Sequence, residues 1–356
     1  MAEGSWIYQR LRTLRRSART RFYTLLFGLA PDGDAPPPDL KAARRILLVL
    51  VNFRLGNTVM ATPAVRALCD ALDGRTLDFL GGPAAPALLA GFPLRTIHVV
   101  ERRDLWQPWR LVRGLRELRR ERYDVAIHLA EASTSLGALL TRLSGAPQRV
   151  GAAGRDRNFF FTKAVPSTAG HKVDQINAFV RALGIAATSE RTLALAPGER
   201  ERARAWLREH AGEGSLPIAL FVGARAHKGK SWTSAAMGKL AEGLRARGFR
   251  LLVVLGPEEQ SELAEIRAAL GAATYAHGLP VRDVAALLSL CAAVVTPDAG
   301  PMHLAIASGA PTIALFRKGN FARWGPRPPQ GEVVFDPAGG EVTAVLQAVE
   351  RLARIG

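Results

Sequence analysis

The chain of 356 residues is long enough for two domains of ordinary size, each with its own core. Hydrophobic residues make up 48% and charged residues 22%, a globular composition, and no stretch approaches the ~18 uninterrupted apolar residues of a membrane-spanning helix. The net charge of +17 favours an anionic partner. Zinc-finger spacing, an aromatic RNA-binding signature and a heptad basic region are all missing, so we expect no nucleic-acid partner.

Residues 1–38 are expected to form a basic amphipathic extension that ends in a Pro-rich linker. Within residues 5–30, aromatic and leucine side chains lie opposite six arginines at helical spacing, the composition of a helix that binds an anionic membrane surface. No small-residue cleavage pattern follows Phe22 and the short apolar run after it, which argues against a secretory signal. A disordered or core-packed extension and an Arg-rich transit peptide are the alternatives.

Residues 39–197 alternate short apolar runs with helical patterns, which predicts a doubly wound α/β domain. The apolar run 46–51 predicts a strand buried on both faces, which brings the turn 52–57 to the carboxyl edge of a parallel sheet. Further strands are expected at 77–80, 96–100, 125–129 and 149–151. A strongly basic helix at 105–122 is either a solvated face or a surface for an acidic acceptor or anionic headgroups.

Residues 198–356 repeat the alternation, with strands expected at 218–222, 251–255, 292–295 and 312–316. In the stretch 292–316, a strand, a loop, a helix and a strand should gather Asp298, Gly300 and His303 at a strand's carboxyl end, where ligands bind in open parallel sheets. Unpaired N–H groups at the helix start suit a phosphate or diphosphate. The alternative is an N-capping Asp and a partly buried His in an ordinary βαβ unit.

The hexapeptide Asp298-Ala299-Gly300-Pro301-Met302-His303 resembles the donor-site motif of the heptosyltransferase family, glycosyltransferase family 9, which usually has Ser or Thr at position 299. Lys230-Ser231-Trp232 is similar to the family's K-x-W pattern, and Gly256-Pro257-Glu258-Glu259 is similar to its G-x-x-E turn. The resemblance implies a GT-B fold, in which two doubly wound Rossmann-like domains face a cleft and the last helix packs back on the first domain.

The resemblance also implies a donor site in the second half. Lys228 and Lys230 lie in a Gly-containing loop that suits a diphosphate, and the matched pattern favours Lys230. Glu259, or Glu258 in another register, would hold the donor ribose. The expected donor-binding residues are Lys230, Glu259, Asp298, Gly300, Pro301, Met302 and His303.

The general base is the point at which the chain departs from the family. The family's R-x-G-D turn supplies a carboxylate for the acceptor hydroxyl, whereas this chain has Arg54-Leu55-Gly56-Asn57, and an amide cannot take that proton. Either Asn57 only positions the acceptor, or the chemistry is slow or lost. By topology, His128 and Glu131 are the nearest other bases. The expected acceptor-binding residues are Arg54, Gly56, Arg113 and Arg120.

The resemblance implies an inverting, metal-independent glycosyltransferase without a cofactor, peripheral on the cytoplasmic face of a bacterial inner membrane. It would move a sugar from a nucleotide-sugar donor, by family ADP-heptose, to an acidic lipid-linked acceptor of lipopolysaccharide-core type. Neither Cys69 nor Cys291 has metal-ligand spacing around it. The alternatives are a GT-B enzyme with a different nucleotide sugar and a nucleotide-sugar-binding protein that has lost catalysis.

Overall fold

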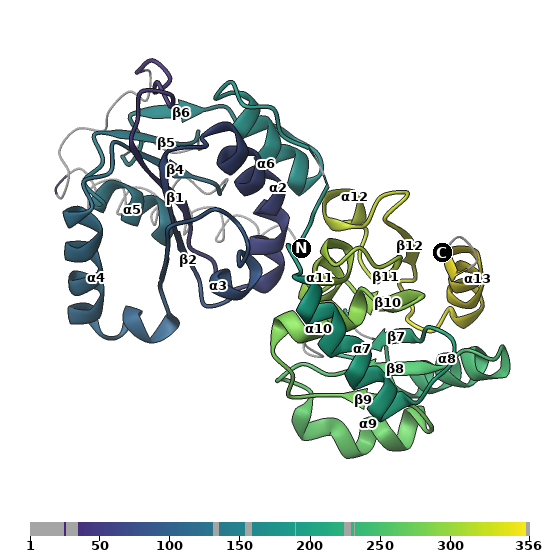
Figure 1. Ribbon diagram of the computed structural model, residues 1–356. Helices are drawn as coiled ribbons and strands as arrows, with labels where there is room; N and C mark the ends of the chain where they lie inside the picture. Colours follow the sequence, from purple (N-terminus) through teal and green to yellow (C-terminus); the bar gives the residue numbers. More distant parts are fainter. Residues whose placement is uncertain are drawn as a thin grey trace.

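The computed structural model describes Leu25 and residues 35–130, 135–153, 159–188, 190–223, 229–230 and 232–353. These residues form two six-stranded parallel sheets, one in each half of the chain, with helices on both faces of each sheet (Figure 1). The predicted α/β class with two doubly wound, Rossmann-like halves is confirmed. The predicted helix 5–30 lies outside the described residues except for Leu25. No helix within the described residues is long and apolar enough to cross a membrane.

The first sheet has the strand order β3-β2-β1-β4-β5-β6. Its strands are β1 (Arg45–Leu50), β2 (Thr76–Gly81), β3 (Thr96–Val99), β4 (Val125–His128), β5 (Gln148–Ala152) and β6 (Lys163–Val165). Its helices are α2 (Leu55–Ala71), α3 (Ala85–Leu88), the 3-10 helix η1 (Arg102–Leu105), α4 (Pro108–Arg120), α5 (Leu136–Leu143) and α6 (Lys172–Arg181).

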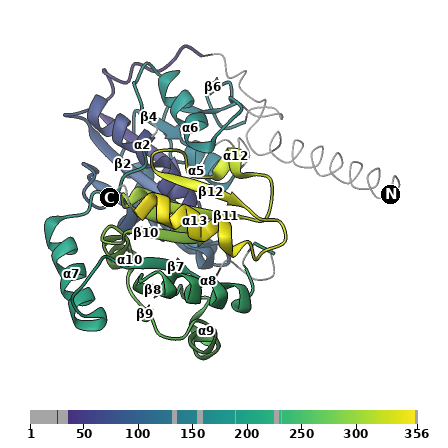
Figure 2. The ribbon, with the colours of Figure 1, turned by 90° about the vertical axis from the view of Figure 1, so that its right-hand side faces the viewer.

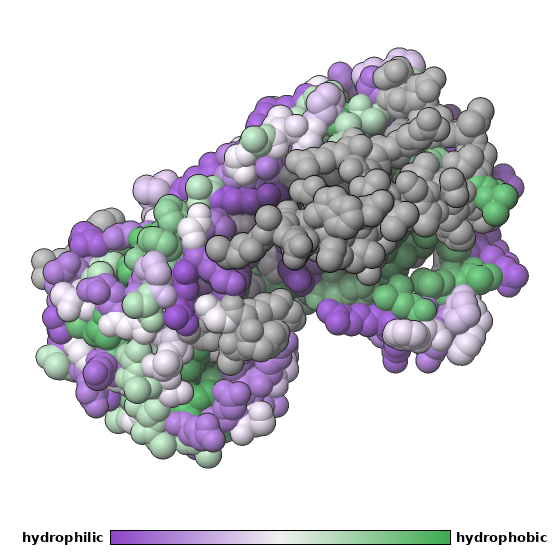
Figure 3. Space-filling view, turned by 180° about the vertical axis from the view of Figure 1, so that it is seen from behind, coloured by the Kyte–Doolittle hydropathy of each residue, from purple (hydrophilic) through white to green (hydrophobic). Residues whose placement is uncertain are grey.

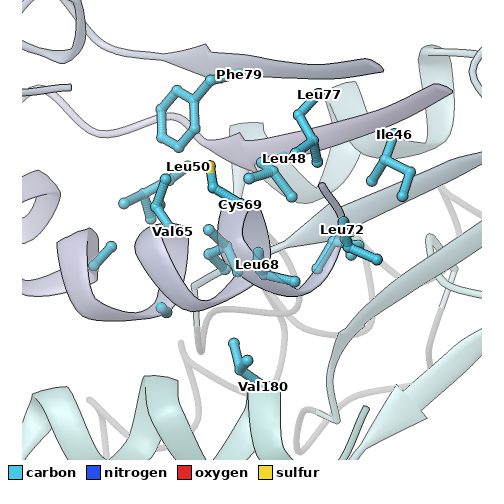
Figure 4. Close-up of a cluster of buried hydrophobic side chains, with 14 of the residues drawn as sticks. Ile46, Leu48, Leu50, Val65, Leu68, Cys69, Leu72, Leu77, Phe79 and Val180 are labelled. Atoms are coloured by element: carbon cyan, nitrogen blue, oxygen red, sulfur yellow. The ribbon is translucent and has the colours of Figure 1, made fainter. Parts of the chain in front are cut away.

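The central strand β1 explains why helices cover both faces of this sheet. Successive side chains of a strand point to opposite faces, and every residue from Ile46 to Val49 is fully buried. Ile46 and Leu48 pack with residues of α2 and α6, a cluster that Figure 4 shows around Leu68. Leu47 and Val49 pack on the other face with α4 and α5. A continuous apolar run therefore forms a strand that is buried on both sides.

The second sheet has the order β12-β11-β10-β7-β8-β9. Its strands are β7 (Ile218–Phe221), β8 (Leu251–Val254), β9 (Thr274–Ala276), β10 (Ala293–Pro297), β11 (Thr312–Phe316) and β12 (Gly331–Phe335). Its helices are α7 (Pro197–Ala211), α8 (Ser234–Ala246), η3 (Gln260–Glu262), α9 (Leu263–Leu270), α10 (Val281–Leu288), α11 (Gly300–Ala307), α12 (Phe321–Trp324) and α13 (Val342–Ala353).

The sequence patterns missed three strands and misplaced one helix. The strands β6, β9 and β12 all lie at sheet edges and are only partly buried, so they lack a continuous apolar run. The prediction that the last helix packs back on the first domain was wrong. Val345 and Val349 of α13 are fully buried against α8 and the second sheet, so the helix covers its own half (Figures 1 and 2).

Candidate active site

The main cavity lies where the two halves meet and has a volume of about 910 Å³. It opens at the carboxyl ends of β1, β7, β8 and β10, the usual position for ligands in parallel α/β sheets. The first half lines it with residues 53–57, and the second half with 254–260, 298–301 and several single residues. Predicted site residues that line the cavity are Arg54, Gly56, Asn57, Lys230, Glu259, Asp298, Gly300, Pro301 and His303.

Two helix N-termini meet at this cavity. The first residues of α2 and α11 pack together, because a Cβ atom added to Gly300 would lie only 3.7 Å from Leu55 Cβ. Neither helix has an acidic residue in its first turn, and neither Arg54 nor Ala299 caps its helix with a side-chain hydrogen bond. Both positive dipole ends therefore act on the same space, which favours an anion there.

The cavity also holds a cation paired with a buried carboxylate. The ammonium group of Lys230 donates to the carboxylate of Asp298 and, at 3.2 Å, to the Asp298 carbonyl oxygen. Asp298 is buried, whereas the Lys230 side chain keeps about a quarter of its surface exposed (28%). Lys230 can therefore reach a ligand in the cavity while Asp298 orients it.

Glu259 follows β8 and lies in a space that two glycines leave open. A Cβ atom on Gly223 would fall 1.8 Å from Glu259 Oε1, and one on Gly256 would fall 2.7 Å from Oε2. Burial raises the pKa of the Glu259 carboxyl, while the backbone N–H groups of Gly256 and Glu259 oppose that shift. Of the two candidate glutamates, Glu259 is partly buried and Glu258 is exposed.

His303 is buried in the first turns of α11 and is neutral. Its Nδ1 accepts a hydrogen bond from Arg191 Nη1 at 3.1 Å, since a guanidinium can only donate, so the ring proton belongs on Nε2. Burial, helped by the charge on Arg191, lowers the pKa of His303 to about 3. The edge of the ring lies against α2, where a Cβ atom on Gly56 would be 2.6 Å from Cδ2. His303 is thus a neutral donor at the junction of the halves.

Arg191 is the residue that sequence reasoning missed. It lies in the segment that joins α6 to α7 and is only 2% exposed, and burial lowers the pKa of its guanidinium to about 10, which leaves it charged at neutral pH. Its single signal in the sequence is a charged residue two positions before the apolar segment 193–195. Arg191 and His303 are 112 positions apart in the sequence, so no local pattern reveals their contact.

Three of the residues predicted to bind donor or acceptor do not line the cavity. Met302 is fully buried among Ile306, Ala314 and Phe316, so it packs α11 onto its own half. Arg113 and Arg120 lie on the solvent face of α4, because Leu111, Leu115 and Leu118 direct the opposite face to the sheet. Arg113 and Arg120 therefore lie away from the cavity, and their acceptor-binding role stays a prediction.

Of the two residues proposed as alternative bases, only His128 belongs to the described part of the chain. His128 is buried outside the cavity, with its ring stacked on Phe161 at a centroid distance of 5.5 Å and its Nε2 3.1 Å from Ser135 Oγ. Burial lowers the pKa of His128 to about 3, which makes the ring a weak base, and His128 does not line the cavity. Glu131, like Lys228, lies outside the described residues. No three His, Cys, Asp or Glu side chains in the described part of the chain cluster as metal ligands.

Comparison with known proteins agrees with this arrangement. The chain is 25% identical over 223 residues to lipopolysaccharide heptosyltransferase 3 of Escherichia coli, covering 60% of this chain and 64% of that protein, somewhat under two thirds of its length. It is 28% identical over 293 residues to lipopolysaccharide heptosyltransferase 1 of Pseudomonas aeruginosa, covering 76% and 78% of the two chains.

Solved structures share the fold. A glycosyl transferase family 9 protein from Veillonella parvula superposes with a TM-score of 0.76 at 18% identity, covering 92% of this chain and 99% of that one. The ADP-heptose lps heptosyltransferase II of E. coli superposes with a TM-score of 0.71 at 19% identity, covering 88% and 99%. The sequence profile of glycosyltransferase family 9 (heptosyltransferase) matches residues 111–343. The chain therefore belongs to glycosyltransferase family 9.

Proposed function

We propose that this protein transfers heptose from ADP-heptose to an acidic acceptor of lipopolysaccharide-core type. The observation that carries the proposal is the cavity shared by both halves, which is lined by Lys230 and by the adjoining N-termini of α11 and α2. The names of the E. coli and P. aeruginosa relatives support the sugar and the acceptor class. We also propose a peripheral place on the cytoplasmic face of the inner membrane.

The donor would lie against the second half. Lys230 and the N–H groups at the start of α11 suit the diphosphate, because they supply a point charge and a helix N-terminus at the same place. Glu259 suits the ribose, since one carboxylate can accept hydrogen bonds from two adjacent hydroxyls. On the other side, Arg54 and the uncapped start of α2 suit an anionic group of the acceptor.

The reaction would be an inverting, metal-independent displacement. The acceptor oxygen attacks the anomeric carbon, the bond from that carbon to the diphosphate breaks, and the electron pair leaves with the nucleoside diphosphate. Lys230 and the α11 amides stabilise the charge that develops on the leaving group, and His303 Nε2–H is a further neutral donor. Full turnover in the presence of a chelator is the expected result, and Mn²⁺-dependent recovery of a chelated enzyme would contradict it.

The described first-half residues that line the cavity include no carboxylate that could take the proton of the acceptor hydroxyl. Asn57 occupies the position of the family's carboxylate. This observation favours a second candidate function, a protein that binds the nucleotide sugar without transferring it.

One experiment separates the two functions. ADP and ADP-heptose are titrated calorimetrically into the wild type, Asn57→Asp and Asn320→Asp, and transfer to a deacylated core acceptor is then followed. Asn320→Asp is the matched control, because it adds a carboxylate to the same cavity from the second half. Turnover in the wild type supports the enzyme, whereas donor binding with turnover only in Asn57→Asp supports the binding protein. If none of the three proteins binds ADP, both candidate functions are refuted.

A further inference from the structure

We propose that the surface formed by η1 and α4 docks the protein on an anionic membrane. This docking surface consists of the exposed apolar side chains Leu105, Trp106, Trp109 and Val112 and of the outward arginines Arg113, Arg116 and Arg120. It extends the proposed function to the place where a lipid-linked acceptor would be met. Binding to lipid can be measured without any donor, so the two proposals fail separately.

The apolar part of the docking surface is unusual because it is not the face that packs on the protein. Leu111, Leu115 and Leu118 already direct one face of α4 to the sheet. On the outside, Trp106 is 87% exposed and Trp109 is 66% exposed, with Leu105 and Val112 close to half exposed. Tryptophan concentrates at membrane interfaces, where its apolar ring is buried and its N–H stays among the headgroups.

The arginines lie on the same outward stripe of α4 as Trp109. Arg113, Arg116 and Arg120 follow Trp109 at intervals of four, three and four residues, which places all four side chains on one helix face. Within the described residues, Arg113 pairs with Glu117 at 3.1 Å, whereas Arg116 and Arg120 form no ion pair. The stripe therefore presents net positive charge beside exposed indole rings, and an anionic bilayer complements both features.

The docking surface lies close to the first-half side of the cavity. The guanidinium carbon of Arg102, in η1, lies 5.5 Å from the centre of the Phe53 ring, and Phe53 lines the cavity. In Figure 3, where the molecule is seen from behind, hydrophobic residues border hydrophilic ones at the lower right, over η1 and α4. A membrane held here would bring lipid-linked saccharides to the first-half side of the cavity.

The test measures binding of the full chain to vesicles of phosphatidylcholine alone and of phosphatidylcholine mixed with phosphatidylglycerol. Arg116→Glu/Arg120→Glu should lower the partition coefficient on the mixed vesicles about tenfold or more. Arg200→Glu/Arg208→Glu is the charge-matched control, because both arginines are exposed on α7 in the other half, and it should bind like the wild type. If both double variants lost the same amount of vesicle binding, net charge alone would explain the loss, and the proposal would be overturned.

A second readout tests the tryptophans directly. Brominated lipid should quench the fluorescence of the wild type more strongly than that of Trp106→Phe/Trp109→Phe, since both indoles enter the interface. Equal quenching, or binding to phosphatidylcholine as strong as to the mixed vesicles, would overturn the assignment. Duplex DNA that binds as tightly as the mixed vesicles would show a surface for polyanions in general. An unchanged midpoint of urea unfolding in each variant confirms that the fold is intact.

Discussion

The contact between Gly223 and Glu259 allows a sharp test of the donor site. Gly223 lies two residues after the end of β7, and its backbone is outside the left-handed region, so alanine is not strained there. The added Cβ atom would lie 1.8 Å from Oε1 and 2.1 Å from Cδ of Glu259, while real Cβ contacts do not come below 3.0 Å. Gly223→Ala must therefore displace the carboxylate by about 1 Å or more.

The displacement sets the expected loss of affinity. A hydrogen bond to a charged group is worth about 1.5–3 kcal/mol, so losing one such bond to the ribose should weaken ADP binding roughly 10- to 150-fold. Calorimetric titration with ADP measures this loss. The matched control is Gly319→Ala, which adds a Cβ atom with nothing within 4 Å and should leave the affinity unchanged.

A double-mutant cycle decides whether Glu259 mediates the effect. In a Glu259→Ala background there is no carboxylate to displace, so Gly223→Ala should cost less than about 0.5 kcal/mol further. Additive losses in the cycle would show that Gly223 acts through the backbone or another residue. Wild-type affinity in Gly223→Ala would refute the assignment of Glu259 to the donor.

Three further predictions follow from the described contacts. Lys230→Met should weaken ADP binding roughly 10- to 150-fold but leave adenosine binding unchanged, by calorimetry. The pKa values of buried His128 and His303 are lowered to about 3, so the unfolded chain binds protons first and the free energy of unfolding should fall as pH drops below about 6.5. Urea titrations at pH 7 and pH 5 measure this, and an unchanged free energy would contradict it. Arg282→Met should destabilise the fold by about 3 kcal/mol, because it leaves Glu199 buried and unpaired. Adding Glu199→Met should restore part of that loss.

The secondary structure of the sheet centres could be read from the sequence alone. Continuous apolar runs such as 46–51 and 312–316 are long enough to bury a strand on both faces, and the second was placed with its observed bounds. The turns after these strands necessarily come to one edge, so the cavity formed where motif residues such as Lys230, Glu259 and Asp298 were expected. Local pattern and the geometry of parallel strands suffice for this part.

The contacts between distant segments were decided only by the tertiary structure. The pairs Lys230–Asp298 and Arg191–His303 join residues that are 68 and 112 positions apart, and no local pattern relates them. Motif membership also did not settle which way a side chain faces. Met302 belongs to the donor motif, yet helix geometry turns it into the core, and the same geometry directs Arg113 away from the cavity.

The last helix shows the same limit. The resemblance implied that this helix packs on the first domain, whereas its apolar side chains pack against α8 and the second sheet. The sequence thus determined the strands at the centre of each sheet, and which motifs end at the carboxyl edge of each sheet, because these depend on neighbours along the chain. Helix placement, the partners of buried charges and the orientation of single side chains depend on packing between remote segments, which only the folded chain defines.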